Sequence, residues 1–166
     1  VNRMYDVYAS DEEFNKTDIF IKNFADSLQP NNYSTRDFLN RLGNKLQDKN
    51  SILSTAAKKN IPVFCPAIAD SGIGLSLAWH IQKRKEEKCQ SILIDTIQDN
   101  LEILELKIKA KKSGAIHIGG GVPKNFIQQI APLAEILNLK TSSHSYGIQI
   151  TTDDPKWGGL SGSTFS

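Results

Sequence analysis

The spacing of hydrophobic residues changes near residue 60. Before that point, apolar side chains recur every three and four positions, which is the spacing of amphipathic helices. Thr17–Leu28 has this spacing, and the polar run QPNN after it predicts a helix end. The string STRD, which begins at Ser34, is a capping box ahead of apolar positions from Phe38 to Leu46, and it predicts a second helix. We expect both helices to serve as scaffold.

After residue 60, short apolar runs alternate with helical patterns. The runs are IPVFC (61–65), SILID (91–95), GAIHI (114–118) and YGIQI (146–150). The helical patterns between them are Ile73–Gln82, Ile97–Lys111 and Pro123–Leu137. Continuous apolar strands separated by helices are typical of a parallel sheet covered on both faces. The sequence therefore predicts an α/β fold: a Rossmann-like doubly wound parallel sheet with helices on both faces, in one domain over residues 1–166.

Composition and charge exclude some classes of partner. Of the 166 residues, 39% are hydrophobic and 23% are charged, which suits an ordinary domain with its own core. The 20 basic and 18 acidic residues leave a net charge of +2, which gives no reason to expect nucleic acid or an anionic membrane as a partner. No apolar run reaches the roughly 20 residues of a membrane span, and no secretion signal opens the chain, so we expect a cytoplasmic protein.

Cysteine and histidine spacing gives no sign of a metal or redox site. Cys65 and Cys89 lack a CxxC or Cys/His spacing, and we expect reduced thiols. His80, His117 and His144 stand apart from one another, which favours structural or solvated roles. No Ser-His-Asp set or GxSxG elbow is visible, so a hydrolase is disfavoured.

The candidate chemistry lies after the strands, because ligands of open parallel sheets bind beyond the carboxyl ends of the strands. The segments there are PAIADSGIG (66–74), DTIQD (95–99), GGGVPKN (119–125) and TTDDPKWGGLSGS (151–163). Three consecutive glycines, residues 119–121, permit positive φ and open the backbone to a ligand, and a helix start follows them. The expected ligand is a dinucleotide pyrophosphate or ribose, although packing of a tight turn explains a lone GGG equally well.

Two residues in these segments have alternatives that stay open. Asp70 suits either the hydroxyls of a ribose or the capping of the next helix. Trp157 lies in a Gly-rich loop, where it suits either an apolar wall over a ligand or a loop anchor.

Five strings together resemble the deoxyhypusine synthase family. They are NRMYD (2–6), RLGNKL (41–46), NIPVFCPAIADSGIG (60–74), GAIHIGGGVPKNFI (114–127) and YGIQITTDDPKWGGLSGS (146–163). Such proteins use NAD to oxidise spermidine, pass the aminobutyl group through an imine to an enzyme lysine, and deliver it to an acceptor amine. The acceptor is a lysine of translation initiation factor 5A in deoxyhypusine synthase, and putrescine in the similar homospermidine synthases. The resemblance implies the family's NAD-binding fold and a homotetramer with active sites at a dimer interface.

The resemblance also implies roles for single residues. Those expected to contact NAD are Asp70, Gly119, Gly120, Gly121, Thr152, Asp153 and Ser161. Those expected to line the polyamine site are Leu75, Asn125, Gly158, Gly159 and Leu160. No metal ligand is implied.

The family's catalytic lysine lies in a WGK motif, which we expect a few residues beyond Ser166. The family's N-terminal NAD-contacting segment has no counterpart in the 166 residues. We therefore expect these residues to belong to a longer enzyme and to be inactive alone. Lys124 and Lys156 are not assigned as nucleophiles, and Lys124 is expected to be solvated or to face a phosphate.

Three positions depart from the family pattern. Family members carry acids where this chain has Leu75 and Leu160, and a histidine where it has Asn125. Carboxylates recognise ammonium groups, so the loss of two acids should weaken the binding of a spermidine-like cation. The strings GGGVPKN and GGLSG are more similar to the divergent bacterial and archaeal branch. Transfer to putrescine, use of another amine, and a non-catalytic NAD-binding subunit are the alternatives that stay open.

Overall fold

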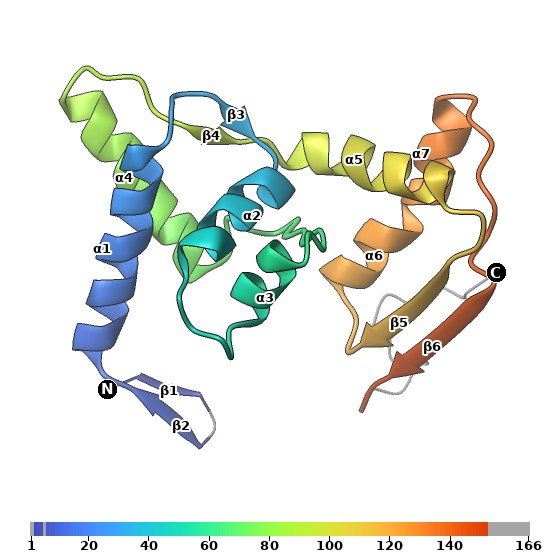
Figure 1. Cartoon of the computed structure of the whole chain (residues 1–166), viewed down its shortest axis with the longest axis horizontal. Coiled ribbons are helices and arrows are strands. Elements are labelled where there is room, and N and C mark those ends of the chain that lie inside the picture. Colours follow the sequence, from blue (N-terminus) through green and yellow to red (C-terminus); the bar gives the residue numbers. More distant parts are fainter. Residues whose placement is uncertain (1, 5, 153–166) are drawn as a thin grey trace. The chain divides into compact units, whose positions relative to one another are not determined.

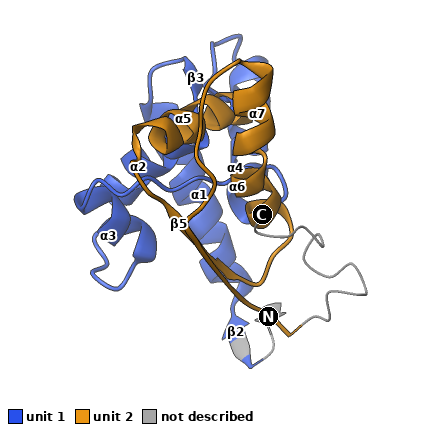
Figure 2. Ribbon diagram, turned by 90° about the vertical axis from the view of Figure 1, so that its right-hand side faces the viewer, with its two compact units in different colours: residues 1–95 blue, residues 96–166 orange. Residues whose placement is uncertain are grey.

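The computed structural model describes residues 2–4 and 6–152, which form helices and short strands (Figure 1). The chain consists of two compact units, residues 1–95 and 96–166 (Figure 2). Each unit has its own helices and its own paired strands.

The first unit is mostly helical. Its elements are β1 (Asn2–Met4), β2 (Val7–Ala9), α1 (Asp11–Ser27), β3 (Asn32–Tyr33), α2 (Thr35–Lys45), α3 (Ile52–Lys58), α4 (Gly72–Glu86) and β4 (Leu93–Ile94). β1 and β2 pair antiparallel, whereas β3 and β4 pair in parallel. Helix α1 packs along α4, and α2 packs on α3.

Serine side chains set the starts of all four helices of the first unit. The hydroxyls of Ser10, Ser34, Ser51 and Ser71 each accept the backbone N–H three residues further on, at 3.1 to 3.2 Å. Such caps satisfy N–H groups that the helix itself leaves unpaired. The predicted cap at Ser34 is confirmed. Helix α1 begins earlier than its hydrophobic spacing predicts, because Ser10 caps it and three acidic residues occupy its first turn.

The core of the first unit lies among α1, α2 and α4. Its buried members are Phe24, Ala25, Tyr33, Phe38, Leu39, Leu42, Ile68, Leu77 and Ile92. The rings of Phe24 and Phe38 lie 5.5 Å apart between centroids, which joins α1 to α2. Gly43 allows α2 to approach α3, since a Cβ built there would lie 2.6 Å from the carbonyl oxygen of Leu53.

The second unit contains the longer parallel strand pair. Its elements are α5 (Thr96–Lys109), β5 (Gly114–Ile118), α6 (Val122–Gln128), α7 (Ile130–Ile136) and β6 (Tyr146–Ile150). A small core of Leu104, Ile130 and Ala134 joins α5 to α7. The predicted strands 114–118 and 146–150 are confirmed, as is their parallel pairing.

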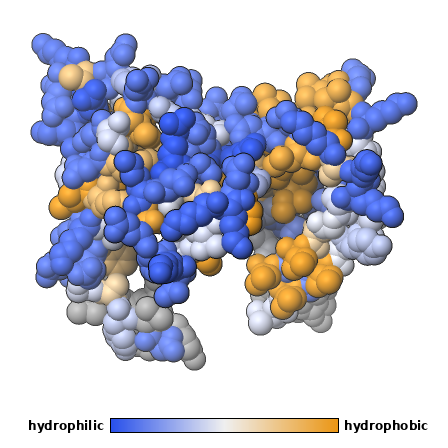
Figure 3. Space-filling view, viewed as in Figure 1, coloured by the Kyte–Doolittle hydropathy of each residue, from blue (hydrophilic) through white to orange (hydrophobic). Residues whose placement is uncertain are grey.

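One face of the β5–β6 pair is buried and the other is exposed. Ile116 lies opposite Ile148, and Ile118 lies opposite Ile150, all on the exposed face. Figure 3 shows hydrophobic side chains gathered there. His117, on the other face, is buried. The continuous apolar strands predict that helices cover both faces of the sheet. Within this unit, however, the four isoleucine side chains of one face are 56 to 83% exposed.

Two predicted elements are wrong. Residues 61–65 form no strand, and the N–H of Cys65 is instead bonded to the hydroxyl of Thr35 at 2.9 Å. An apolar run indicates burial, which an irregular segment also provides. The predicted helix 123–137 is divided into α6 and α7. Pro132 explains the break, because it lacks an N–H and its ring would clash with the carbonyl of Gln128 in a continuous helix.

The fold class is mixed α/β with parallel strand pairs. Within residues 2–4 and 6–152, the strands form three two-stranded sheets, so the doubly wound sheet and the single domain stay predictions. In the same residues, no helix has the length and hydropathy that crossing a membrane requires.

Candidate functional site

The glycine loop lies at the carboxyl end of β5. Gly119 has φ +80° and Gly121 has φ +67°, values that strain any residue with a side chain. Among the described residues, no atom beyond the glycine itself and its chain neighbours lies within 4 Å of a Cβ built at either position. These glycines are therefore required by the backbone conformation, and no described residue fills the space in front of them.

The end of β6 lies beside this loop. The N–H of Gly119 donates to the carbonyl of Ile150 at 2.9 Å, which extends the strand pair by one bond. Thr152 follows two residues later and is exposed. Asn125 is exposed on α6, and its N–H donates to the carbonyl of Gly121 at 3.1 Å. Glycine, threonine and amide groups thus lie at one end of the β5–β6 pair.

A buried lysine is linked to the glycine loop through the side chain of Gln149. Lys124 is 3% exposed, and its Nζ donates to Oε1 of Gln149 at 3.1 Å. The Nε2 of Gln149 donates in turn to the carbonyl of Gly119 at 3.2 Å. The expectation of a solvated Lys124 is therefore wrong, because its side chain is buried and its ammonium group donates to Gln149. A phosphate contact of Lys124 stays a prediction. In the sequence, the one feature that points to this contact is a polar residue, Gln149, within an otherwise apolar strand.

The buried charge of Lys124 also affects His117, which lies opposite Gln149 on the buried face of the strand pair. Burial, and then the nearby Lys124, lower the pKa of His117 below its ordinary value. His117 is therefore neutral near pH 7, which fits the structural role expected for it.

Two predicted site residues belong to the first unit. Asp70 is exposed, and its N–H closes a turn on the carbonyl of Ala67 at 2.9 Å. Ser71, not Asp70, caps α4. Leu75 lies in the first turn of α4 and is 71% exposed.

The remaining predicted site residues lie outside the described residues. They are Asp153, Gly158, Gly159, Leu160 and Ser161, and Lys156 and Trp157 also lie there.

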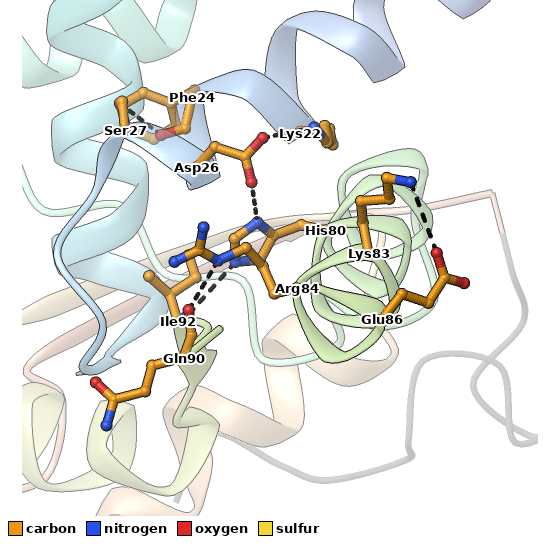
Figure 4. Close-up of polar contacts among 10 residues, drawn as sticks. All are labelled: Lys22, Phe24, Asp26, Ser27, His80, Lys83, Arg84, Glu86, Gln90 and Ile92. Carbon is orange, nitrogen blue, oxygen red and sulfur yellow. Dashed lines mark hydrogen bonds and ion pairs between the residues drawn. The ribbon is translucent and has the colours of Figure 1, made fainter. Parts of the chain in front are cut away.

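A charged cluster joins the elements of the first unit around His80, which is 1% exposed (Figure 4). Its Nδ1 lies 2.7 Å from Oδ1 of Asp26, and its Nε2 accepts the N–H of Ile92 at 3.4 Å. The Nζ of Lys22 lies 2.6 Å from the second oxygen of Asp26. Both ring nitrogens are thus engaged: because Nε2 accepts the N–H of Ile92, the ring N–H that faces Asp26 is on Nδ1.

The same contacts determine the titration of Asp26. Burial raises its pKa, but the hydrogen bonds from Lys22 and His80 outweigh that effect and hold the pKa below its ordinary value. The cluster therefore acts as a structural link between α1, α4 and the segment before β4.

A second polar cluster lies at the amino ends of β5 and β6. The Nζ of Lys107 donates to the hydroxyl of Ser113, and Nδ1 of His144 lies 3.1 Å from that hydroxyl. Burial lowers the pKa of Lys107; burial, and then the charge of Lys107, lower the pKa of His144. This cluster is at the opposite end of the strands from the glycine loop.

Within the described part of the chain, no group of three or more His, Cys, Asp or Glu side chains is placed to hold a metal ion. Cys65 and Cys89 are free thiols.

The fold and the loop define an α/β protein with a glycine-rich loop at the carboxyl end of a parallel strand pair. The chain belongs to the deoxyhypusine synthase family, because the family model for deoxyhypusine synthase matches residues 1–166.

Named relatives agree with this assignment. "Probable deoxyhypusine synthase 2" of Methanosarcina mazei is 43% identical over 169 residues, covering 99% of this chain and 48% of the relative. The "Deoxyhypusine synthase-like protein" of Chlorobaculum tepidum is 40% identical, over 99% of this chain and 47% of its own length. The chain spans about half the length of the curated relatives it matches.

A solved structure is also similar. The crystal structure of a candidate deoxyhypusine synthase from Entamoeba histolytica is 26% identical and superposes with a TM-score of 0.58. The match covers 68% of this chain and 40% of that chain.

Proposed function

We propose that the protein takes part in the NAD-dependent transfer of an aminobutyl group from spermidine to a lysine of translation initiation factor 5A. The family match over residues 1–166 carries this proposal. The scheme places the imine-forming lysine beyond Ser166, rather than at Lys124 or Lys156. The burial of Lys124 and its bond to Gln149 support that choice, since an engaged ammonium group is a poor nucleophile.

In this scheme the glycine loop is part of the NAD site. Positive φ at Gly119 and Gly121 supports the fit, as does the space before both glycines, which none of residues 2–4 and 6–152 fills. Bound there, NAD would accept a hydride from the polyamine and later return it. The backbone of Gly119, Gly120 and Gly121 would approach the pyrophosphate or ribose, while Lys124 and Gln149 hold the loop in place. Further hydrogen bonds to the cofactor would come from Asp70, Thr152, Asp153 and Ser161.

The residues proposed to line the polyamine site bear on which amine the protein uses. The polyamine site would be lined by Leu75, Asn125, Gly158, Gly159 and Leu160. Leu75 is 71% exposed and offers apolar contact but no charge to an ammonium group. This observation favours a second candidate, in which the protein uses putrescine as acceptor, acts on another amine, or binds NAD as a non-catalytic subunit.

We also propose the assembly and fold of the whole protein. The parallel pairs β3–β4 and β5–β6 would belong to a doubly wound sheet within one domain. The protein would form a homotetramer in the cytoplasm, with active sites at a dimer interface. The exposed isoleucines of β5 and β6 support further packing on that face, since parallel strands are normally covered on both sides.

The test supplies the complete protein with NAD and with spermidine labelled in its aminobutyl part. Purified translation initiation factor 5A and putrescine are offered in separate reactions, and a reaction without NAD is the control. Label on a lysine of the factor would support the proposal, and label in homospermidine would support the second candidate. Label in neither product, from protein that binds NAD, would contradict transfer from spermidine and favour another amine or a non-catalytic subunit.

A further inference from the structure

A lysine, a serine and a histidine meet at the amino ends of β5 and β6. Lys107 comes from the last turn of α5, Ser113 directly precedes β5, and His144 lies shortly before β6. All three side chains are half-buried, so each keeps part of its surface open to solvent. The glycine loop lies at the opposite end of these strands. This cluster therefore goes beyond the function proposed above and does not depend on it.

Main-chain bonds hold the segments that carry Ser113 and His144. The N–H of Ser145 donates to the carbonyl of Ser113 at 2.8 Å, which joins the two segments just ahead of the strands. Gly114 and Tyr146 then begin the parallel pairing of β5 with β6. Because the backbone fixes both segments, a change of one side chain in the cluster should leave the other two in place.

Hydrogen bonds connect the three side chains. The Nζ of Lys107 donates to the hydroxyl of Ser113. The Oγ of Ser113 lies 3.1 Å from Nδ1 of His144, and the Nζ of Lys107 lies 3.4 Å from the same nitrogen. A hydroxyl that accepts from the amine can donate its own proton to the imidazole. The contacts therefore offer a path for a proton from the amine of Lys107 to the ring of His144.

Lys107 differs from its neighbour on α5 in having no acid beside it. The Nζ of Lys109 lies 2.6 Å from Oε1 of Glu105, whereas no carboxylate of the described residues lies within ion-pair distance of Lys107. Burial lowers the pKa of Lys107, and no acid offsets this effect. The neutral amine, which is the nucleophilic form, is therefore more populated at Lys107 than at a solvated lysine.

His144 is suited to accept the proton that such an amine loses. Burial, then the charge of Lys107, and then that of His117 lower the pKa of His144 below its ordinary value. The ring is therefore neutral near pH 7, with Nδ1 directed at the other two side chains.

We propose that Lys107 is a site of acylation by thioesters. The amine attacks the carbonyl carbon of the thioester, so that an N–C bond forms, the C–S bond breaks and the thiol leaves as a thiolate. His144 takes up the proton that the amine loses, directly or through the hydroxyl of Ser113, and passes it to the thiolate or to water. The product is an amide, which removes the positive charge of Lys107 from the end of α5.

The probe for this proposal is S-acetyl-N-acetylcysteamine, a small acetyl thioester. The complete protein is incubated with the probe at neutral pH, and peptide mass spectrometry follows acetylation at each lysine over time. Two lysines of the same unit serve as internal references: Lys109, which is ion-paired, and Lys124, which is 3% exposed. We expect Lys107 to be acetylated several times faster than Lys109, and Lys124 to stay unmodified.

His144→Gln tests the role of the base, because glutamine keeps a polar side chain but takes up no proton at this pH. It should slow acetylation of Lys107 to the rate at Lys109, while the rate at Lys109 stays the same. Ser143→Ala is the matched control, since it changes an exposed residue of the same segment and should alter neither rate.

Thermal melting should confirm that both variants fold. The ratio of the two lysine rates within one sample also separates loss of the base from a general loss of structure. Equal rates at Lys107 and Lys109 in the parent, an unchanged ratio in His144→Gln, or acetylation of Ser113 in place of Lys107 would each overturn the proposal.

Discussion

The carboxylate of Asp26 joins two helices of the first unit through its two oxygens. One oxygen meets His80 of α4, and the other meets Lys22 of α1 (Figure 4). His80 continues the link to the backbone of Ile92, which precedes β4. Since each group in the chain of contacts is buried or half-buried, the removal of one leaves the next without its partner.

Replacement of His80 by alanine should therefore destabilise the fold strongly. The variant leaves a cavity, an unpaired N–H at Ile92 and a carboxylate with one partner fewer. We expect the free energy of unfolding to fall by ~2–4 kcal/mol, measured by urea denaturation. Gln82→Ala, an exposed change on the same helix, should stay within about 0.5 kcal/mol of the parent. Similar losses in both variants would contradict the structural role of His80.

The lowered pKa of Asp26 predicts a loss of stability in acid. The unfolded chain takes up a proton near the ordinary value of 3.8, whereas the folded chain does so at lower pH. The contribution of this group is therefore complete above the ordinary value and disappears as the pH falls through the lower folded value. Urea unfolding from pH 7 to pH 3 should show a steeper loss for the parent than for Asp26→Asn. Parallel curves would count against the contacts to Lys22 and His80.

The glycine loop and the strands before it act as one element. The turn after β5 places Gly119 and Gly121 at positive φ. Lys124 donates to the side chain of Gln149, which in turn donates to the carbonyl of Gly119 and so fixes the turn. Gly72, in contrast, opens α4, has no positive φ and would meet nothing with an added Cβ.

The two glycines should respond oppositely to alanine. Gly121→Ala should lower the free energy of unfolding by roughly 1–2 kcal/mol, because a side chain strains the left-handed conformation. Gly72→Ala should be neutral or stabilising by about 0.4–1 kcal/mol, since alanine favours the helix and restricts the unfolded chain. The measurement is thermal or urea unfolding of both variants. Equal effects would show that the conformation at Gly121 is not required.

The sequence predicts helices and strands well where the local pattern of apolar residues is strong. The strands 114–118 and 146–150 are predicted because each is a five-residue apolar run next to glycine or polar residues. The run at 61–65 carries the same signal but no strand partner, because pairing depends on distant segments. β3 has two residues, too few for any periodicity. The link from Asp26 to His80 spans 54 positions, which no local pattern can indicate.

On the scale of the whole molecule, the isoleucines of β5 and β6 form an exposed apolar surface among the described residues. Ile116, Ile118, Ile148 and Ile150 form two opposed pairs on one face (Figure 3). Contiguous apolar patches of this kind mark surfaces that associate. The sequence predicts that these strands favour burial, but not which segment covers them, because an apolar run does not identify its partner.

The 166-residue chain should therefore associate as its concentration rises. The double variant Ile118→Lys and Ile150→Lys places two charges on the exposed face and should keep the chain monomeric. Sedimentation over a range of concentrations measures the effect. A parent chain that stays monomeric throughout would contradict the role of this face in association.

The proposed aminobutyl transfer begins with the oxidation and cleavage of spermidine. The most direct measurement is the release of diaminopropane when the complete protein is incubated with NAD and spermidine but no acceptor. Cleavage of spermidine to diaminopropane needs NAD and not the acceptor, so it tests the first half of the reaction alone. We predict NAD-dependent release, despite leucine at positions 75 and 160 and asparagine at 125. No release from protein that binds NAD would contradict the proposed transfer from spermidine and would indicate another amine or a non-catalytic subunit.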